Sequence, residues 1–244
     1  MPALAAVLFD IDDTLYSTTA FAKRARRAAV RAMIEAGLDL PEEQVVKELD
    51  EVIAEFSSNY DHHYEKLLQR LRAPSLERVN PALIVAAGVA AYHDTKFQEL
   101  KPFDDVIPLL RDLRDAGLVV GIITHGWTVK QAEKLVRLGL LPYLDPAAVT
   151  ISDQIGISKP NPKLYQAALR NLGLEPAQAM YVGDSPEHDV APPRSLGWRT
   201  VWARRAAKRG LEGTGIEPDH VVDDFDQLRG ILAGTYGVPI PVAG

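Results

Sequence analysis

The chain has 244 residues, of which 47% are hydrophobic and 25% are charged, and this composition is ordinary for a globular protein. Its length allows one large domain, or a core domain with a smaller insert. The formal net charge of -6 argues against a sequence-independent nucleic-acid binder, and the absence of cysteine excludes disulfides, thiolate metal sites and cysteine nucleophiles.

Two clusters of basic residues interrupt this acidic balance, at Lys23 to Arg31 and at Arg204 to Arg209. The first lies on an alanine-rich helical pattern and the second in a predicted loop, so we interpret both as solvated faces. The apolar N-terminal stretch lacks a basic region before it and runs directly into Asp10, which favours a strand over a signal peptide. Since no long apolar run follows, we expect a cytoplasmic enzyme with neither nucleic acid nor a membrane as partner.

The chain opens on a short apolar run, Val7 to Phe9, and polar residues follow it at once: Asp10, Asp12, Asp13 and Thr14. A run of this length that is bounded by polar residues predicts a buried parallel strand. Such strands present ligands and catalytic groups at their carboxyl ends. Because crowded carboxylates repel one another, either a cation lies among them or their pKa values are split for acid and base chemistry.

From about Thr18 to Phe97 the apolar residues repeat with the period of a helix, and no strand is indicated. Helices are predicted over residues 20–36, 41–57, 60–71 and 81–97. This pattern is typical of a small helical bundle inserted into another domain. We therefore place the insert at residues 17–99, the core at 1–16 and 100–244, and the two linkers near 16–19 and 98–102.

Strands and helices alternate from Lys101 onward. The predicted strands cover residues 118–123, 149–151, 179–182, 200–202 and 220–222. The predicted helices cover residues 104–116, 127–138 and 162–172, with two more around Arg194 and Gln227. The alternation predicts an α/β fold, with a Rossmann-like three-layer core whose parallel sheet includes the opening strand. Residues 234–244 are rich in glycine and proline and are predicted to form a loosely held tail.

Four groups of polar residues follow a predicted strand or precede a predicted helix. They are Asp10 with Asp12, Asp13 and Thr14; Thr124-His125-Gly126; Lys159-Pro160; and Gly183-Asp184-Ser185 with Asp189. Because the strand ends of a parallel sheet converge on one crevice, residues that are distant in sequence can meet there. Their types are the ones that phosphoryl transfer requires: a nucleophile, a second acid or base, a cation site, a hydroxyl donor and a lysine.

These segments resemble the four signature motifs of the haloacid dehalogenase superfamily. The motif apolar-Asp-x-Asp-x-Thr matches Phe9 to Thr14, and the apolar strand that ends in Ser or Thr matches Ile122 to Thr124. The lysine before a helix matches Lys159, and Gly-Asp-x-x-x-x-Asp matches Gly183 to Asp189. The helical insert resembles the C1-type cap of subfamily I. The resemblance covers nearly the whole chain, and four motifs in order are far more specific than any one of them.

The resemblance implies a division of roles among the carboxylates. Asp10 would be the nucleophile that forms an aspartyl-phosphate, and Asp12 the acid that protonates the departing oxygen and the base that later deprotonates water. Both tasks require an Asp12 pKa near the working pH, which Asp10 would raise and a metal would lower. Mg2+ is the implied cofactor, held by Asp10, Asp184 and the main-chain carbonyl of Asp12. Asp189 either belongs to the metal site or is an N-terminal helix residue.

The remaining motif residues are implied to bind the substrate. Thr124 and nearby backbone N–H groups, including that of Gly126, would bind the phosphoryl oxygens, while Lys159 would neutralise charge on the nucleophile and the phosphate. His125 stands where the family often has Asn or Asp, so it either contacts phosphate or substrate or is an oriented loop histidine. Asp13 occupies a variable position of the motif and is interpreted as a turn residue.

One further departure follows the last motif. Pro192 and Pro193 come after Asp189, where relatives usually continue a helix. Because adjacent prolines fit only in a first turn, we expect this helix to start late.

Asp12 favours a phosphatase over a dehalogenase, because an alkoxide leaving group needs a proton and a halide does not. We expect a monomer or homodimer that hydrolyses the phosphate monoester of a small metabolite. A phosphomutase, a haloacid dehalogenase and a non-catalytic binding protein on the same fold are the alternatives.

Two segments of the insert, Ala91 to Phe97 and Ser57 to Tyr60, are similar to cap segments of a subgroup found in archaea and some bacteria. Its members are often labelled glyceraldehyde-3-phosphate phosphatases. Tyr92, His93 and Lys96 lie near the return from insert to core, where we expect packing between the two, with substrate contact as the alternative. The two linkers predict a hinged cap that excludes water during phosphoryl transfer and later releases product.

Overall fold

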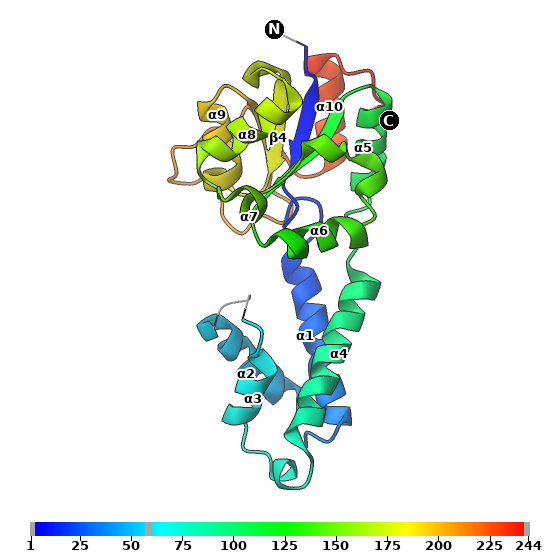
Figure 1. The fold of residues 1–244 in the computed structure, drawn as a ribbon, viewed down its shortest axis with the longest axis vertical. Coiled ribbons are helices and arrows are strands. Elements are labelled where there is room, and N and C mark those ends of the chain that lie inside the picture. Colours follow the sequence, from blue (N-terminus) through cyan, green and yellow to red (C-terminus); the bar gives the residue numbers. More distant parts are fainter. Residues whose placement is uncertain (1–2, 57–59, 242–244) are drawn as a thin grey trace. The chain divides into compact units, whose positions relative to one another are not determined.

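The structure is a computed structural model that describes residues 3–56 and 60–241. The chain forms two compact units (Figure 1). The core unit comprises Met1–Thr18 and Lys101–Gly244, and the insert unit comprises Thr19–Leu100.

The core unit is built on a parallel sheet of six strands in the order β3-β2-β1-β4-β5-β6. The strands are β1 (Ala6–Phe9), β2 (Val119–Thr124), β3 (Val149–Ile151), β4 (Ala179–Gly183), β5 (Arg199–Ala203) and β6 (His220–Val222). The opening strand lies in the middle of the sheet, where Phe9 is paired with Ile122 of β2 and Val182 of β4. The predicted α/β class with a Rossmann-like parallel core is confirmed.

Helices cover both faces of the sheet, with α8 and α9 on one side and α5 and α10 on the other (Figure 1). The helices of this unit are α5 (Val106–Asp115), α6 (Thr128–Arg137), α7 (Ser152–Ile155), α8 (Pro162–Leu172), α9 (Ala191–Ser195) and α10 (Phe225–Tyr236). Leu8 belongs to a buried cluster that includes side chains of α8, whereas the ring of Phe9 lies 5.7 Å from that of Phe225 in α10. Both faces of β1 are therefore buried, which explains its uninterrupted apolar sequence.

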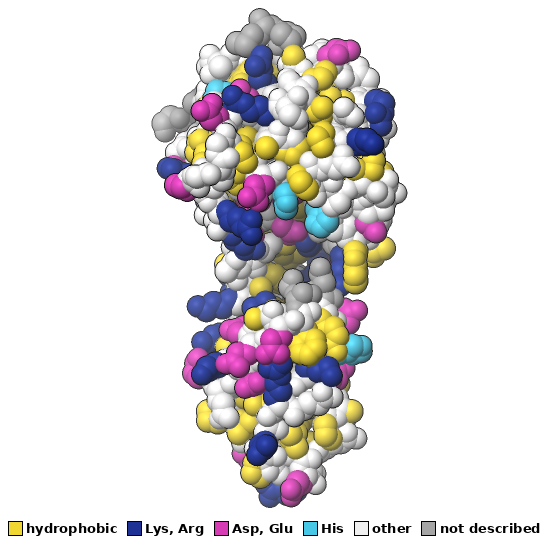
Figure 2. Space-filling view, turned by 90° about the vertical axis from the view of Figure 1, so that its left-hand side faces the viewer, with side chains coloured by type: hydrophobic (Ala, Val, Ile, Leu, Met, Phe, Trp, Pro, Cys, Tyr) yellow, Lys and Arg dark blue, Asp and Glu magenta, His cyan; other side chains and the backbone are white. Residues whose placement is uncertain are grey.

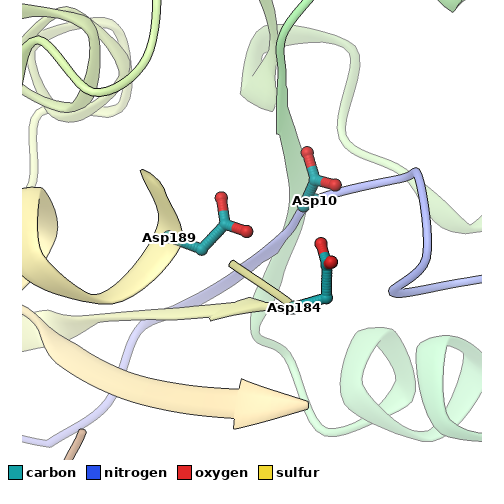
Figure 3. Close-up of side chains that lie close together, drawn as sticks. All are labelled: Asp10, Asp184 and Asp189. Carbon is teal, nitrogen blue, oxygen red and sulfur yellow. The ribbon is translucent and has the colours of Figure 1, made fainter. Parts of the chain in front are cut away.

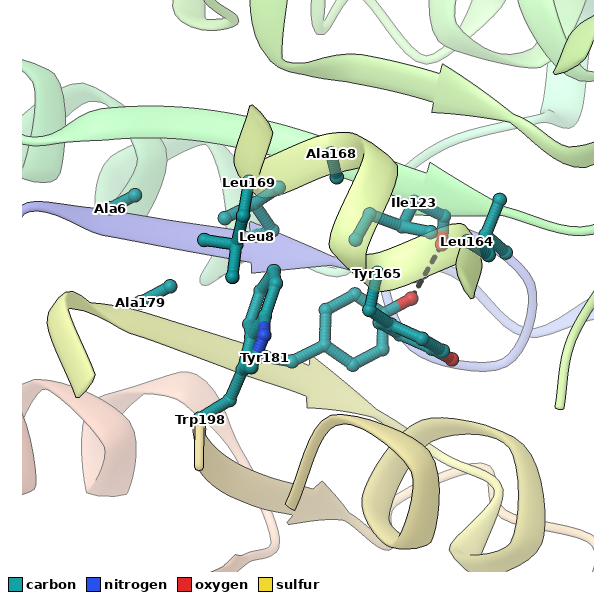
Figure 4. Close-up of a cluster of buried hydrophobic side chains, with 10 residues drawn as sticks. All are labelled: Ala6, Leu8, Ile123, Leu164, Tyr165, Ala168, Leu169, Ala179, Tyr181 and Trp198. Atoms are coloured by element: carbon teal, nitrogen blue, oxygen red, sulfur yellow. Dashed lines mark hydrogen bonds between the residues drawn. The ribbon is translucent and has the colours of Figure 1, made fainter. Parts of the chain in front are cut away.

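Three aromatic rings pack together between β4, α8 and the segment before β5 (Figure 4). The ring of Tyr181 lies 5.3 Å from that of Tyr165 and 6.3 Å from that of Trp198, both edge-on. The Tyr181 hydroxyl donates a hydrogen bond of 2.5 Å to the carbonyl of Ile123 in β2 (Figure 4). The phenol oxygen of Tyr181 thus connects β4 to β2 across the central strand β1.

Within the described residues the insert unit contains helices and no strand. Its helices are α1 (Thr18–Glu35), α2 (Glu42–Phe56), α3 (His63–Arg70) and α4 (Pro81–Glu99), with a 3-10 turn at Pro74–Glu77. The buried centre of this unit includes Val30, Met33, Leu49, Leu67 and Ile84. Gly88 lets α4 approach α1 closely, because a Cβ at that position would lie 2.8 Å from Cγ of Met33. Asn80 caps α4 by accepting a hydrogen bond from the backbone N–H of Ala82.

The observed elements depart from the expected ones in two places. The short helix α7 and several 3-10 turns are not indicated by the sequence, because a single turn has too few residues to show a period. The prediction of a loose tail from Gly234 is wrong over its first part, since α10 continues to Tyr236 and the side chains of Val238 and Ile240 are buried. Residues 57–59 and 242–244, including most of the Ser57 to Tyr60 segment, lie outside the described residues.

No helix among the described residues combines the length and the hydropathy that a membrane crossing requires.

Candidate active site

The carboxyl ends of β1 and β4 open onto a cavity of about 550 Å³ in the core unit. Six predicted site residues line it: Asp10, Asp12, His125, Lys159, Asp184 and Asp189. Thr124 and Gly126, which the resemblance also implicates, are not among the lining residues. Figure 2 shows acidic, basic and histidine side chains next to one another on the core unit, in the upper part of the view.

The ammonium group of Lys159 lies between two buried carboxylates. Its Nζ is 2.6 Å from Oδ1 of Asp10 and 2.7 Å from Oδ1 of Asp189, and it also donates to the Tyr181 hydroxyl at 2.8 Å. The Lys159 side chain is only 3% exposed. Burial alone would lower the pKa of Lys159, but the two carboxylates outweigh it and raise this pKa well above its usual value. Lys159, which the sequence motif already assigns to the site, is therefore a permanent positive charge inside it.

Asp10, Asp184 and Asp189 form a cluster in which one oxygen from each carboxylate lies within 4.8 Å of the others (Figure 3). Burial, the largest cause, and the charge of Asp189 raise the pKa of Asp10 to about 7, although Lys159 opposes the rise. Burial and the charges of Asp189 and Asp10 raise the pKa of Asp184 to about 8. The single ammonium of Lys159 therefore does not balance the negative charge of the three carboxylates. An all-oxygen set with surplus negative charge fits a hard divalent cation.

Asp189 reaches this cluster because the backbone of Gly183 lies directly against it. A Cβ on Gly183 would be 2.4 Å from Cβ of Asp189, so a larger residue would displace the carboxylate. Asp189 is 1% exposed and accepts a hydrogen bond of 2.9 Å from the backbone N–H of Ser185. It lies in a π-helical turn, Pro186–Val190, and α9 begins only afterwards, with its two prolines in the first turn as expected.

The Asp12 carboxylate has different surroundings and does not belong to the three-carboxylate cluster. Nζ of Lys134 lies 2.7 Å from its Oδ1 and 2.6 Å from its Oδ2. The Tyr16 hydroxyl donates to Oδ1 at 2.5 Å, and Nε2 of Gln131 donates to Oδ2 at 3.4 Å. Burial raises the pKa of Asp12, but Lys134, Tyr16 and Gln131 outweigh it, and the net pKa lies below its usual value.

This arrangement corrects the expectation that the neighbouring Asp10 would hold the Asp12 pKa near the working pH. In the structure the charge of Lys134 is the largest influence that opposes burial, and the Asp12 pKa is lowered. Sequence reasoning missed Tyr16, Gln131 and Lys134 altogether. Gln131 and Lys134 are three residues apart on α6 and face the same way, which is the one signal in the sequence that could have suggested a polar helix face toward the site.

Thr124 and Gly126 are bonded within the protein. Thr124 is 1% exposed, and its hydroxyl donates to Oε1 of Gln131 at 3.3 Å. The backbone N–H of Gly126 donates to the Ser152 hydroxyl at 3.0 Å. Gln131 also donates to the carbonyl of His125 at 2.8 Å, so this glutamine ties the loop after β2 to the Asp12 carboxylate.

His125 lies at the rim of the cavity with one ring nitrogen engaged. Its Nδ1 lies 2.7 Å from the Ser158 hydroxyl and 3.3 Å from the Ser152 hydroxyl. Partial burial, the largest cause, and the nearby charge of Lys159 lower the pKa of His125. Both effects favour the neutral form of the imidazole.

Asp13 confirms its interpretation as a turn residue, because its φ of 58° lies in the left-handed region. Its carboxylate accepts a hydrogen bond of 2.8 Å from the backbone N–H of Thr18 and lies 2.6 Å from Nζ of Lys208. Lys208 and Arg209 line the cavity, and their side chains are 61% and 77% exposed, so the interpretation of the Arg204 to Arg209 cluster as a solvated face is confirmed for these two residues. The loop that carries Lys208 and Arg209 lies at the carboxyl ends of the strands, which the sequence does not indicate.

A parallel sheet with an aspartate pair after its central strand, a buried lysine and a carboxylate cluster defines a hydrolase of the haloacid dehalogenase type. The family model described as "haloacid dehalogenase-like hydrolase" matches residues 4–197, and the chain belongs to this family.

Curated relatives are similar over nearly their full length. The chain is 46% identical over 231 residues to "Glyceraldehyde 3-phosphate phosphatase" of Methanopyrus kandleri, covering 93% of this chain and 96% of that protein. It is 39% identical to the protein of the same name in Methanothermobacter thermautotrophicus, covering 94% of this chain and 100% of that protein. Among solved structures, a "HAD phosphatase from Thermococcus onnurineus" superimposes with a TM-score of 0.65 at 26% identity, covering 95% and 99% of the two chains.

Proposed function

We propose that this hydrolase is a phosphatase that cleaves the phosphate monoester of a small metabolite through an aspartyl-phosphate on Asp10. The observation that carries the proposal is the pair of unlike carboxylates after β1. Asp10 is buried against Lys159, whereas Asp12 is partly exposed and bonded to α6. This difference in surroundings supports our assignment of Asp10 as the nucleophile and Asp12 as the acid and base.

The proposed reaction has two balanced halves. An oxygen of Asp10 attacks phosphorus, the ester P–O bond breaks, and the departing alkoxide takes a proton from Asp12. The Asp12 carboxylate then takes a proton from water, the water oxygen attacks phosphorus, and the Asp10–phosphorus bond breaks to release inorganic phosphate. Lys159 holds the Asp10 side chain and supplies positive charge to the phosphoryl group throughout.

A divalent cation, for which Mg2+ is our candidate, would be held by Asp10, Asp184, Asp189 and the main-chain carbonyl of Asp12. When bound it supplies charge that offsets the phosphoryl oxygens and the crowded carboxylates. The raised pKa values of Asp10 and Asp184 support this assignment, because they show a cluster with too little positive charge of its own. Thr124, His125 and Gly126 are proposed as substrate-binding residues from the loop after β2.

The substrate that we propose first is glyceraldehyde 3-phosphate. This proposal rests on the names of the relatives that are 46% and 39% identical to the chain. We further propose that the insert unit is a C1-type cap, that the enzyme acts in the cytoplasm, and that it is a monomer or homodimer.

The test is a screen of phosphorylated trioses, sugars, glycolate and nucleotides with Mg2+, which compares kcat/KM for the wild type and the Asp10→Asn variant. We expect inorganic phosphate from the wild type alone, with glyceraldehyde 3-phosphate among the best substrates. Formation of an isomeric phosphate ester would instead indicate a phosphomutase, and halide release from 2-haloacids a dehalogenase. Equal inactivity of both proteins across the screen would contradict the enzymatic proposal.

A further inference from the structure

Three side chains donate hydrogen bonds to the Asp12 carboxylate. Lys134 and Gln131 belong to α6, which follows β2, and Tyr16 is four residues after Asp12 itself. Asp184 and Asp189, by contrast, follow β4. Because β2 and β4 flank β1 on opposite sides, the two donors of α6 come from the opposite flank of β1 to Asp184 and Asp189.

These contacts engage both oxygens of the carboxylate. Lys134 reaches Oδ1 and Oδ2, Tyr16 adds a second donor to Oδ1, and Gln131 adds a second donor to Oδ2. A carboxylate with donors on both oxygens has its side-chain torsions fixed, which a single contact would not achieve. Lys134 alone supplies full positive charge, so it is the dominant member of this set.

The need for such a restraint follows from the neighbouring cluster. Asp12 is two residues from Asp10, and an unrestrained carboxylate at that distance could turn toward the same cation as Asp10, Asp184 and Asp189. An acid that protonates the leaving oxygen must instead stay off the cation and point at the scissile ester. Misplacement of a catalytic group by about 1 Å costs on the order of 100-fold in rate.

We infer that Lys134 is a positioning residue, which acts through Asp12 and, with Tyr16 and Gln131, holds this acid away from the carboxylate cluster and toward the leaving group. The inference rests on the proposed function, because it assigns Lys134 to the step in which the ester oxygen departs. It predicts that loss of Lys134 lowers kcat/KM most for substrates whose leaving group must be protonated.

The experiment compares Lys134→Met with the wild type on two substrates. One is glycerol 3-phosphate or the best alkyl phosphate found, whose leaving group needs a proton, and the other is 4-nitrophenyl phosphate, whose leaving group does not. Because kcat/KM reports the enzyme through the first irreversible step, it isolates phosphoryl transfer to Asp10. We expect a loss of about 10- to 100-fold for the alkyl ester and less than about 3-fold for the aryl ester.

Two further variants separate positioning from general damage. Lys130→Met is the matched control, since Lys130 lies one turn earlier on α6 with its ammonium 4.3 Å from the ring of Trp127, and it should leave both substrates unaffected. In an Asp12→Asn background, Lys134→Met should cause no further loss, because the group that it positions is already gone. The thermal midpoint of Lys134→Met, measured alongside, should stay close to that of the wild type.

Three results would overturn the inference: equal losses on the two esters, an equal effect of Lys130→Met, or additive losses in the Asp12→Asn background. Lys134→Arg covers the case in which the methionine variant folds poorly, and it should recover part of the alkyl-ester activity because the charge is kept. A wild type that hydrolyses neither ester, with or without Mg2+, would instead overturn the proposed function.

Discussion

The two flanks of the central strand β1 shift the pKa of an aspartate in opposite directions. On the β4 flank, Asp10 shares one buried ammonium with Asp189, and its pKa is raised to about 7. On the β2 flank, Asp12 has Lys134 to itself, and its pKa is lowered. The lesson is that both carboxylates are desolvated by burial, and that the share of positive charge that each receives decides whether its pKa ends above or below the usual value.

The largest expected effect comes from the residue at the boundary between the flanks. Asp10→Asn should lower kcat/KM by at least about 1,000-fold, because the amide is a poor nucleophile. Steady-state phosphate release measures this, and Asp115→Asn at the exposed end of α5 is the matched control. Activity within 10-fold of the wild type would require a different nucleophile.

Removal of each lysine compares the stability of the two flanks directly. Lys159→Met leaves two buried carboxylates unpaired and should cost roughly 3–5 kcal/mol of unfolding free energy at pH 8. Lys134→Met should cost about 1 kcal/mol or less, because its side chain is 18% exposed and that of Asp12 31%. Urea unfolding of the metal-free proteins measures both values, and equal losses would show that the flanks do not differ.

The pH dependence of stability sharpens the comparison further. In the metal-free protein, Asp10 and Asp184 keep protons up to about pH 7 and about pH 8, whereas the unfolded chain releases them near 3.8. A pKa raised by folding means that stability is lost as the pH rises between these values, so these two groups should destabilise the protein from about pH 4 to about pH 8. Asp184→Asn should remove the part of this loss of unfolding free energy that is due to Asp184.

Addition of Mg2+ at neutral pH should then release protons and raise the thermal midpoint more at pH 8 than at pH 5. Calorimetric titration in buffers of different ionisation enthalpy measures the proton count. A Mg2+ affinity that is independent of pH would contradict the assignment of these carboxylates to the cation.

The smallest expected effect concerns His125, which directly follows β2. His125→Asn introduces a residue that the family often has at this position and should change KM by about 3- to 10-fold with kcat nearly unchanged, as for loss of one hydrogen bond. Ser158→Ala removes the hydroxyl at 2.7 Å from Nδ1 and should shift KM in the same direction if ring orientation matters. Unchanged KM in both variants would make His125 a loop residue only.

The positions of the strands and most helices could be predicted because their signals are local. Val7 to Phe9 is apolar without alternation because both faces of β1 are covered, and the insert repeats with a helical period. The convergence of Asp10, Lys159 and Asp184 could also be predicted, since it follows from the parallel sheet alone.

The partners of these groups could not be predicted, because pairing is tertiary. Nothing local in the sequence links Lys134 to Asp12, which is 122 residues away, or Lys208 to Asp13. The error about the Asp12 pKa has the same origin: the sequence shows its acidic neighbour Asp10 and hides its basic one. The error about the tail has a different origin. Val238 and Ile240 are apolar in the sequence and buried in the structure, but the surrounding glycines and prolines favoured the prediction of a loose segment.

The hydroxyl of Tyr181 joins two parts of the protein that are usually considered separately. It lies among Tyr165 and Trp198 in the apolar interior, yet it is 2.8 Å from the ammonium of Lys159. Substitutions that repack this interior will therefore move the lysine beside Asp10 as well. A selection for heat resistance acting on these three rings would at the same time be a selection on turnover, and the two properties would not evolve independently.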